Sequence, residues 1–256
     1  MDRSAFARTM RVLERRHPFH DWSAGMTPFE ILISTVLSQS TTVANERRGF
    51  AELRERLGAV TPGVLTAASE QEIAQAIWHA GLARQKAPRI HAIALDVLRR
   101  CGGSLIPTLR LPTRQAREAL MSLPGVGPKT ADVVLAMAAD HPTFPVDTHI
   151  ARIARRWNLV TKGDYESTRA ALEAWTPPRK RKAWHLALIA HGRELCKAHN
   201  PRCDACPVRR DCDWYRSHGV RKRGGLGGRG RARTPGNKGL RTARGLARVA
   251  TDLVRA

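Results

Sequence analysis

The sequence lacks any apolar run that approaches the roughly 18 residues of a membrane-spanning helix, since its best apolar stretch covers only residues 184–190. It also lacks the apolar core of a secretory signal near its start. Acidic residues are scarce, with 22 Asp and Glu against 44 Lys and Arg, and the formal net charge is +22. These absences predict a cytoplasmic protein. The charge predicts a polyanionic partner, with nucleic acid as the first candidate.

The alternating pattern that marks β-strands is missing too, and the spacing of apolar residues before residue 216 is helical almost throughout. Thr27, Pro28 and Glu30 form the start signal of a helix whose residues 29–37 are apolar nearly all round, which is typical of a buried helix. We therefore predict an all-α fold. Further helices are expected at 42–57, 70–80, 83–101, 113–121, 128–139, 148–156, 165–174 and 180–191, with short loops such as 61–63 and 102–112 between them.

The C-terminal segment 216–256 has 12 Lys and Arg residues and a single acidic residue, Asp252. A segment so rich in Gly and Arg cannot bury enough apolar surface to offset the entropy lost on ordering. It predicts a flexible basic arm over 216–239, followed by a short amphipathic helix over 240–254. Attraction to DNA phosphates is favoured over a tail that only keeps the protein in solution.

The segment LPGVGPKTA (residues 123–131) lies between two predicted helices. Gly125 and Gly127 permit a tight turn and close approach of the backbone, and Pro128 presets the start of the next helix. Free amides at such a helix start suit a phosphate. The segment predicts a helix-hairpin-helix motif that contacts the DNA backbone, with Thr130 among its binding residues. An ordinary turn would not need Gly-Val-Gly followed by Lys and Thr.

Cysteine is rare, but four of the five cysteines fall in one short loop with the spacing C-x6-C-x2-C-x5-C. Thiols this close together in a cytosolic protein suit a metal rather than disulfides. Zinc ribbons usually pair two C-x2-C knuckles, whereas only one is present here, and four thiolates in a compact loop suit an iron–sulfur cluster. The spacing favours the cluster over zinc and leaves both open. The predicted ligands are Cys196, Cys203, Cys206 and Cys212.

Asp147 stands in the sequence VDTHI, directly before a predicted helix. This is the position of an N-cap residue, so a structural role alone explains the aspartate. A catalytic carboxylate at the same position would be held rigidly, as an active site requires. The two roles are compatible.

Together these motifs resemble the endonuclease III family of DNA glycosylases, within the helix-hairpin-helix superfamily. The resemblance rests on LPGVGPKTA, VDTHI-x-R-I, the tripeptide HGR at 191–193 and the cysteine spacing, and it covers about residues 5–215. It implies a [4Fe-4S] cluster rather than zinc on the four cysteines. It also implies two helical lobes with a DNA groove between them. One is a barrel over 25–138, the other a cluster domain made of 1–24 and 139–215, and the tail 216–256 follows.

The resemblance implies a base-excision repair enzyme that acts on damaged double-stranded DNA as a monomer near the bacterial nucleoid. It would remove oxidised pyrimidines as a glycosylase and cut 3′ to the abasic site by β-elimination as a lyase. Lys129 corresponds to the lysine whose neutral amine attacks C1′, and Asp147 to its partner carboxylate. Gln39 aligns with the residue that fills the gap left by the flipped base, and Leu82 with the wedge.

Two departures from the family leave other functions open. Many relatives carry an acidic residue where this chain has Met121, so the range of lesions is in doubt, and Pro128 replaces a basic residue of some relatives. One alternative is a monofunctional mismatch glycosylase, although those relatives usually have Ser or Tyr in place of Lys129. The other is a DNA-binding protein without catalysis, which the intact Lys129 and Asp147 disfavour.

Overall fold

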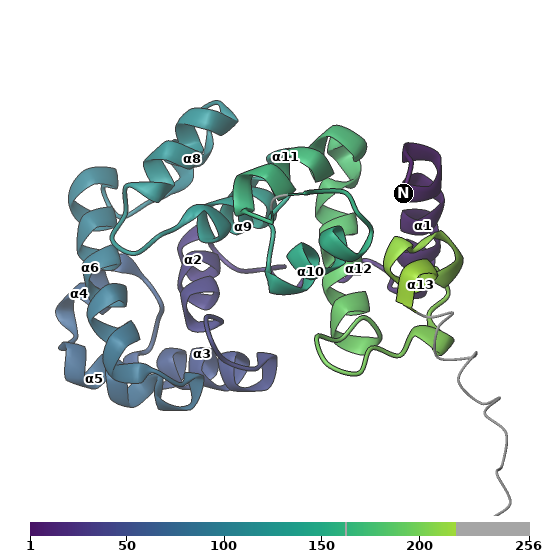
Figure 1. The fold of residues 1–256 in the computed structure, drawn as a ribbon. Coiled ribbons are helices and arrows are strands. Elements are labelled where there is room, and N and C mark those ends of the chain that lie inside the picture. Colours follow the sequence, from purple (N-terminus) through teal and green to yellow (C-terminus); the bar gives the residue numbers. More distant parts are fainter. Residues whose placement is uncertain (162, 219–256) are drawn as a thin grey trace, which may run out of the picture.

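The computed structural model describes residues 1–161 and 163–218, and all regular structure in this part of the chain is helical (Figure 1). The predicted all-α class is confirmed. The predicted basic arm starts too early, because residues 216–218 belong to the last described helix, in which Asp213 pairs with Arg216 one turn later. The rest of the arm and the helix predicted over 240–254 lie outside the described residues.

The elements follow one another through short connections. In chain order they are α1 (Arg3–Arg16), α2 (Pro28–Leu37), α3 (Val43–Leu57), α4 (Pro62–Ala67), α5 (Glu70–Ala76), η1 (Trp78–Ala80), α6 (Ala83–Cys101), α7 (Ile106–Leu109), α8 (Thr113–Met121), α9 (Pro128–Ala139), α10 (Thr148–Arg156), α11 (Tyr165–Trp175), η2 (Pro178–Lys180), α12 (Arg181–Glu194), η3 (Cys203–Ala205), η4 (Arg209–Asp211) and α13 (Asp213–His218).

Most helix starts follow the signals in the sequence. The side chain of Thr27 accepts a hydrogen bond from the Glu30 amide at 3.2 Å, and the Glu30 carboxylate accepts one from the Thr27 amide at 2.7 Å, which completes the predicted capping box of α2. Two short helices were missed by the sequence analysis: α4 begins within the predicted loop 61–63 and continues to Ala67, and α7 lies within the predicted loop 102–112. Helices of four to six residues are too short to display a helical period.

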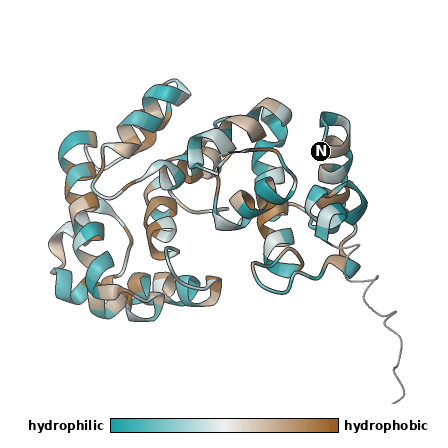
Figure 2. Cartoon of the chain, viewed as in Figure 1, coloured by the Kyte–Doolittle hydropathy of each residue, from teal (hydrophilic) through white to brown (hydrophobic). Residues whose placement is uncertain are grey.

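The first hydrophobic core is built around α2, α6 and α9. Leu32, Ile90 and Val134, one from each of these helices, are completely buried. In Figure 2, α2 is coloured largely brown, as expected for a helix with neighbours on most of its surface. This core places α2 directly against α9, the helix that carries Lys129.

The second core joins the two ends of the described chain. Phe6 of α1 makes edge-on ring contacts with Trp157, Trp175 and Trp184, at centroid distances of 6.2, 5.6 and 5.9 Å. These aromatic contacts hold α1 beside α12, so the first helix lies among the last ones (Figure 1). The predicted domain boundaries stay a prediction. The division of the buried apolar residues into two separate hydrophobic cores supports them.

None of the helices in residues 1–161 and 163–218 combines the length and the hydropathy that crossing a bilayer would require.

Candidate active site and cysteine loop

The hairpin (residues 123–127) connects α8 to α9. Gly125 has a φ of +68°, a left-handed conformation that glycine adopts without the steric cost of a Cβ. Gly127 is the N-cap residue of α9, and no side chain of the described chain caps this helix start. Amides at an uncapped helix start can bind an anion, so the hairpin has the local structure expected of a site for a DNA phosphate.

Lys129 lies in the first turn of α9, and its side chain is mostly withdrawn from solvent. Burial is the main cause that lowers the pKa of this ammonium group, and the nearby positive charge of Arg193 lowers the pKa further. The negative charge of Asp147 acts in the opposite direction. The net shift is downward, which increases the fraction of neutral, nucleophilic amine at a given pH.

Asp147 is the N-cap residue of α10, as the sequence predicts: its Oδ1 accepts a hydrogen bond from the Ile150 amide at 2.8 Å. A carboxylate has a second oxygen, so capping does not use up its capacity to accept protons or hydrogen bonds. Because the charge of Asp147 acts on Lys129, the fold brings together two residues that lie on different helices. The sequence analysis predicted both residues, and the structure brings them near enough to interact electrostatically, while their catalytic roles stay a prediction.

His185 of α12 is a buried neighbour of this pair that the sequence analysis did not identify. Its Nδ1 lies 2.8 Å from the carbonyl oxygen of Pro145, two residues before Asp147. Burial lowers the pKa of His185 to about 4, so the ring is neutral at pH 7. A neutral ring that donates from Nδ1 holds the segment before Asp147 without adding a positive charge. Within an ordinary helical pattern, no signal distinguishes such a histidine.

A second buried contact fixes the start of α9. The hydroxyl group of Tyr165 donates to Asp132 Oδ2 at 2.7 Å and lies 3.5 Å from the carbonyl oxygen of Pro128, next to Lys129. Asp132 is completely buried and also accepts from Arg117 Nε at 3.0 Å and Thr143 Oγ1 at 2.9 Å. A buried carboxylate needs such partners. Together these bonds hold α9 against α8 and α11, and they set the position from which Lys129 projects.

Gln39 lies in the turn after α2, and its side chain reaches the hairpin helix. Gln39 Nε2 donates to Thr130 Oγ1 at 3.4 Å, while its Oε1 accepts from Arg89 Nη1 at 2.9 Å. Thr130 is only 3% exposed, so it contacts Gln39 rather than offering a surface of its own. The two predicted DNA-binding residues Gln39 and Thr130 therefore meet, and the structure adds Arg89 to them.

Leu82 lies on the neighbouring loop, at the N-cap of α6. It is 49% exposed and has a φ of 52°, which costs free energy for a residue with a branched side chain. The buried ammonium group of Lys86 donates to the carbonyl oxygens of Leu37 at 2.7 Å and Ala80 at 2.9 Å. Lys86 thereby ties the end of α2, which leads to Gln39, to the segment that leads to Leu82.

The four predicted cysteine ligands line one common pocket in the second lobe, together with Arg156, Trp157 and His191. Arg156 Nη1 donates to Cys196 Sγ at 3.1 Å, and His191 Nε2 lies 3.8 Å from Cys206 Sγ. Burial raises the pKa of the Cys206 thiol to about 11. In the part of the chain that the structure describes, no group of three Cys, His, Asp or Glu side chains is placed to hold a single metal ion.

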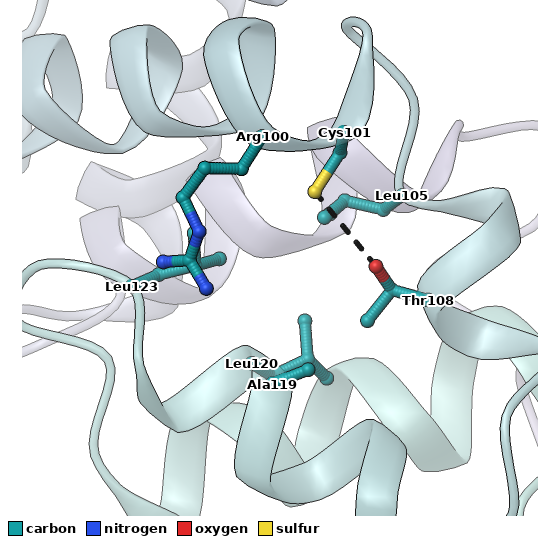
Figure 3. Close-up of a pocket in the computed structure, with 7 residues that line it drawn as sticks. All are labelled: Arg100, Cys101, Leu105, Thr108, Ala119, Leu120 and Leu123. Atoms are coloured by element: carbon teal, nitrogen blue, oxygen red, sulfur yellow. Dashed lines mark hydrogen bonds between the residues drawn. The ribbon is translucent and has the colours of Figure 1, made fainter.

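The fifth cysteine lies elsewhere. Cys101 is the last residue of α6, as the sequence analysis expected, and it lines a cavity beside the hairpin with Arg100, Thr108 and Leu123 (Figure 3). Its sulfur is 3.8 Å from the hydroxyl oxygen of Thr108. None of the other four cysteines lines this cavity, so Cys101 serves as a matched control for substitutions in the cysteine loop.

The chain matches known proteins over most of the described residues. Residues 33–178 match the model of the HhH-GPD superfamily of base excision DNA repair proteins. Endonuclease III of Thermotoga maritima is 35% identical over 192 residues, covering 75% of this chain and 85% of the relative. Endonuclease III of Escherichia coli is 33% identical over 188 residues, covering 73% and 84%.

Solved structures give the same result for the fold. A trapped covalent intermediate of endonuclease III with DNA, an estranged-adenine complex, is similar with a TM-score of 0.75 at 29% identity, covering 85% of this chain and 98% of that chain. A thermostable thymine-DNA glycosylase has a TM-score of 0.72 at 23% identity, covering 84% and 97%, and shares the fold alone. These matches confirm the predicted family resemblance and the two-lobed helix-hairpin-helix fold.

Proposed function

The chain belongs to the endonuclease III family of DNA glycosylases, within the HhH-GPD superfamily of base excision DNA repair proteins, and from this premise we infer that it is a bifunctional glycosylase and abasic-site lyase for oxidised pyrimidines in double-stranded DNA. The observation that carries the inference is the position of Lys129 in the first turn of the hairpin helix, where the charge of Asp147 acts on its ammonium group. A partly buried lysine with a lowered pKa and a nearby carboxylate are the two groups that covalent removal of a base requires.

In the first step, a damaged nucleotide is turned out of the helix so that its C1′ reaches Lys129. The neutral Nζ attacks C1′, the glycosidic bond breaks, and the base leaves with the bonding electrons and takes up a proton. Asp147 accepts the proton that Nζ loses and stabilises the positive charge that develops on the sugar. The capping bond from Ile150 keeps the carboxylate in place during this step.

In the second step, the sugar ring opens and leaves a protonated imine between Nζ and C1′. The imine acidifies the C2′ hydrogen, and loss of that proton expels the 3′ phosphate, which cuts the strand. Water then hydrolyses the imine and restores the lysine. Because both the attack on C1′ and the imine depend on Nζ, loss of the Lys129 amine is expected to stop base removal and strand cleavage together.

The DNA contacts follow from the positions of the surrounding loops. Gly125 and Gly127 expose the backbone of the hairpin to a phosphate. Gln39 enters the gap that the flipped base leaves, and exposed Leu82 wedges the strands apart. Thr130 holds the Gln39 side chain through the hydrogen bond between them. A single chain supplies all these residues, so we propose that the protein acts as a monomer on DNA in the bacterial cytoplasm, near the nucleoid.

We assign a [4Fe-4S] cluster to Cys196, Cys203, Cys206 and Cys212. The shared pocket and the donation from Arg156 to Cys196 Sγ support this assignment, because a cationic donor stabilises a thiolate ligand. A single zinc ion bound tetrahedrally by the four cysteines would hold their sulfur atoms within about 4 Å of one another, because each zinc–sulfur bond is about 2.3 Å long. When bound, the cluster would hold the loop in shape beside α10, while Lys129 and Asp147 carry out the chemistry.

The cluster assignment predicts about four irons per chain and the broad visible absorbance of an iron–sulfur protein. The Cys203→Ser variant is expected to lose most of this iron. Its affinity for DNA is expected to fall more than the rate of its chemical step. Cys101→Ser is the control and is expected to keep the iron, since Cys101 lies outside the pocket. Iron and zinc analysis of anaerobic preparations checks both variants. Stoichiometric zinc without iron would contradict the assignment.

The reaction itself is tested with end-labelled duplexes that contain thymine glycol, an abasic site or a mismatch, with and without borohydride. We expect strand cleavage and a borohydride-trapped protein–DNA adduct with the first two substrates. Base loss that appears as a break only after alkali, without trapping, would instead identify a monofunctional glycosylase. Met121 lies at the end of α8 and is partly buried against the first core. Because it stands where many relatives carry an acidic residue, the assay compares several oxidised pyrimidines.

A further inference from the structure

The imidazole ring of His185 is fixed by the segment that leads to Asp147. Its Nδ1 lies 2.8 Å from the carbonyl oxygen of Pro145, and the ring meets the Phe144 ring edge-on at a centroid distance of 6.2 Å. The side chain comes from α12 and is only 2% exposed. Contacts with two consecutive residues of this segment leave the ring little freedom to turn, so its second nitrogen, Nε2, is held in one direction.

The bond to Pro145 determines where the ring carries its proton. A carbonyl oxygen only accepts, so Nδ1 is the protonated nitrogen, and the neutral ring then has a lone pair at Nε2. Within the described residues Nε2 has no hydrogen-bond partner, yet it is not completely enclosed, in contrast to His17 Nε2 and His191 Nδ1. His185 therefore presents a free proton acceptor at the open edge of an otherwise buried ring.

The electrostatic surroundings of His185 are those of the candidate active site. Burial lowers the pKa of His185 to about 4, so the lone pair is available throughout the neutral pH range. The charges of Asp147, Lys129 and Arg193 all act on the ring, so it lies within electrostatic reach of the amine that is proposed to join C1′. Once the ring takes up a proton, the negative charge of Asp147 and the Pro145 carbonyl stabilise the imidazolium.

We propose that His185 is a further catalytic residue, whose Nε2 removes the C2′ proton in the lyase step. This inference rests on the proposed function, which leaves the acceptor of that proton open. Nε2 takes the hydrogen as a proton, the C–H electron pair forms a C1′–C2′ double bond, and the π electrons of the imine move to Nζ. The pair on Nζ then restores the imine, the C1′–C2′ π pair forms a C2′–C3′ double bond, and the 3′ phosphate leaves with the electrons of the C3′–O bond. The imidazolium returns its proton to solvent from Nε2.

The test separates imine formation from elimination. The full chain reacts with abasic duplexes in a single turnover, and borohydride then traps adducts whose strand is still intact and adducts whose strand is cut. His185→Asn is the informative variant, because its amide still donates to the Pro145 carbonyl but has no basic nitrogen. It is expected to form the imine at about the wild-type rate and to eliminate about 10²-fold more slowly, the scale for a lost general base, so adducts with an intact strand accumulate.

Two further measurements distinguish proton removal from a structural role. Deuterium at C2′ is expected to slow the conversion of intact to cut adducts in His185→Asn further, because breaking the C2′–H bond limits this variant. In the wild type, this conversion is expected to be independent of pH between about 6 and 8, since a ring with a pKa of about 4 keeps its lone pair free over that range. Absence of the isotope effect, or a wild-type rate that rises with pH, would overturn the inference.

His141→Asn is the matched control, because both nitrogens of that ring have partners: Nδ1 lies 3.0 Å from Thr113 Oγ1 and Nε2 2.7 Å from the carbonyl oxygen of Leu109. It is expected to keep the wild-type ratio of intact to cut adducts, and thermal unfolding verifies that each variant retains the fold. If His185→Asn eliminates at the wild-type rate, or loses imine formation and elimination equally, this inference fails while the proposed function stands. If the wild type forms no trapped adduct, the proposed function fails.

Discussion

Lys129→Ala is expected to abolish borohydride trapping and strand cleavage while affinity for abasic DNA is largely retained. Trapping requires a primary amine at C1′, and Lys129, in the first turn after the hairpin, is near enough to Asp147 for the charge of that carboxylate to act on its ammonium group. Alanine keeps the helix start, since α9 begins with Gly127 and Pro128 rather than with the lysine side chain. The measurement is a single-turnover assay with labelled thymine glycol and abasic duplexes.

The pH dependence gives this prediction a second readout. Burial lowers the pKa of Lys129, and the amine attacks only when neutral, so the single-turnover rate rises with pH as the ammonium group deprotonates. The rise is expected at a pH below the ordinary lysine pKa of about 10.4. Lys180→Ala, a loss of one charge at a half-exposed position, serves as the control and should leave trapping unchanged. Undiminished trapping in Lys129→Ala would exclude this lysine as the nucleophile.

Asp147→Asn is expected to slow base removal by about 10²-fold or more, the usual scale for a lost acid–base group. Asparagine is also a good N-cap residue, so the bond to the Ile150 amide and the start of α10 are preserved. Single-turnover release of thymine glycol measures the effect. A second cap, Asp2 of α1, accepts from the Ala5 amide in the same way at 2.8 Å, and Asp2→Asn is the matched control.

The direction of the electrostatic effect makes the Asp147 experiment discriminating. The charge of Asp147 raises the pKa of Lys129. Its removal therefore lowers that pKa and increases the fraction of neutral amine at pH 7. If the carboxylate acted only through this charge, Asp147→Asn would be as fast as the wild type or faster. A slower variant with a pH profile shifted to lower pH would assign a direct role in proton transfer, whereas an unchanged rate would leave Asp147 as a helix cap.

Much of the site could be predicted because its signals are local. The capping box of α2, the glycines of the hairpin and the cap at Asp147 each involve residues within four positions of one another. Local hydrogen bonds of this kind form wherever the same residues occur. The cysteine spacing is similarly local, and it predicted the loop whose four thiols the structure finds around one pocket.

Short elements and helix ends were less predictable. The helices α4 and α7 were missed because four to six residues do not complete enough turns to establish a period. The region predicted as one helix over 70–80 is divided into α5 and η1. Residues 216–218 were predicted to belong to the basic arm because that prediction followed the Gly- and Arg-rich composition of the segment. It did not take into account the ion pair between Asp213 and Arg216.

The sequence by itself determined the helical class, the hairpin and the helix caps, because each depends on chemistry carried by neighbouring residues, and its resemblance to the endonuclease III family supplied the candidates Lys129 and Asp147. Only the tertiary structure decided what surrounds them. Arg89 meets Gln39 across 50 positions of sequence, and His185 meets the Pro145 carbonyl across 40. Such pairs arise when separate helices pack around a common core, which sets distances and orientations that no local pattern encodes. The candidate nucleophile could therefore be named from the sequence, but the residues that surround it became visible only in the fold.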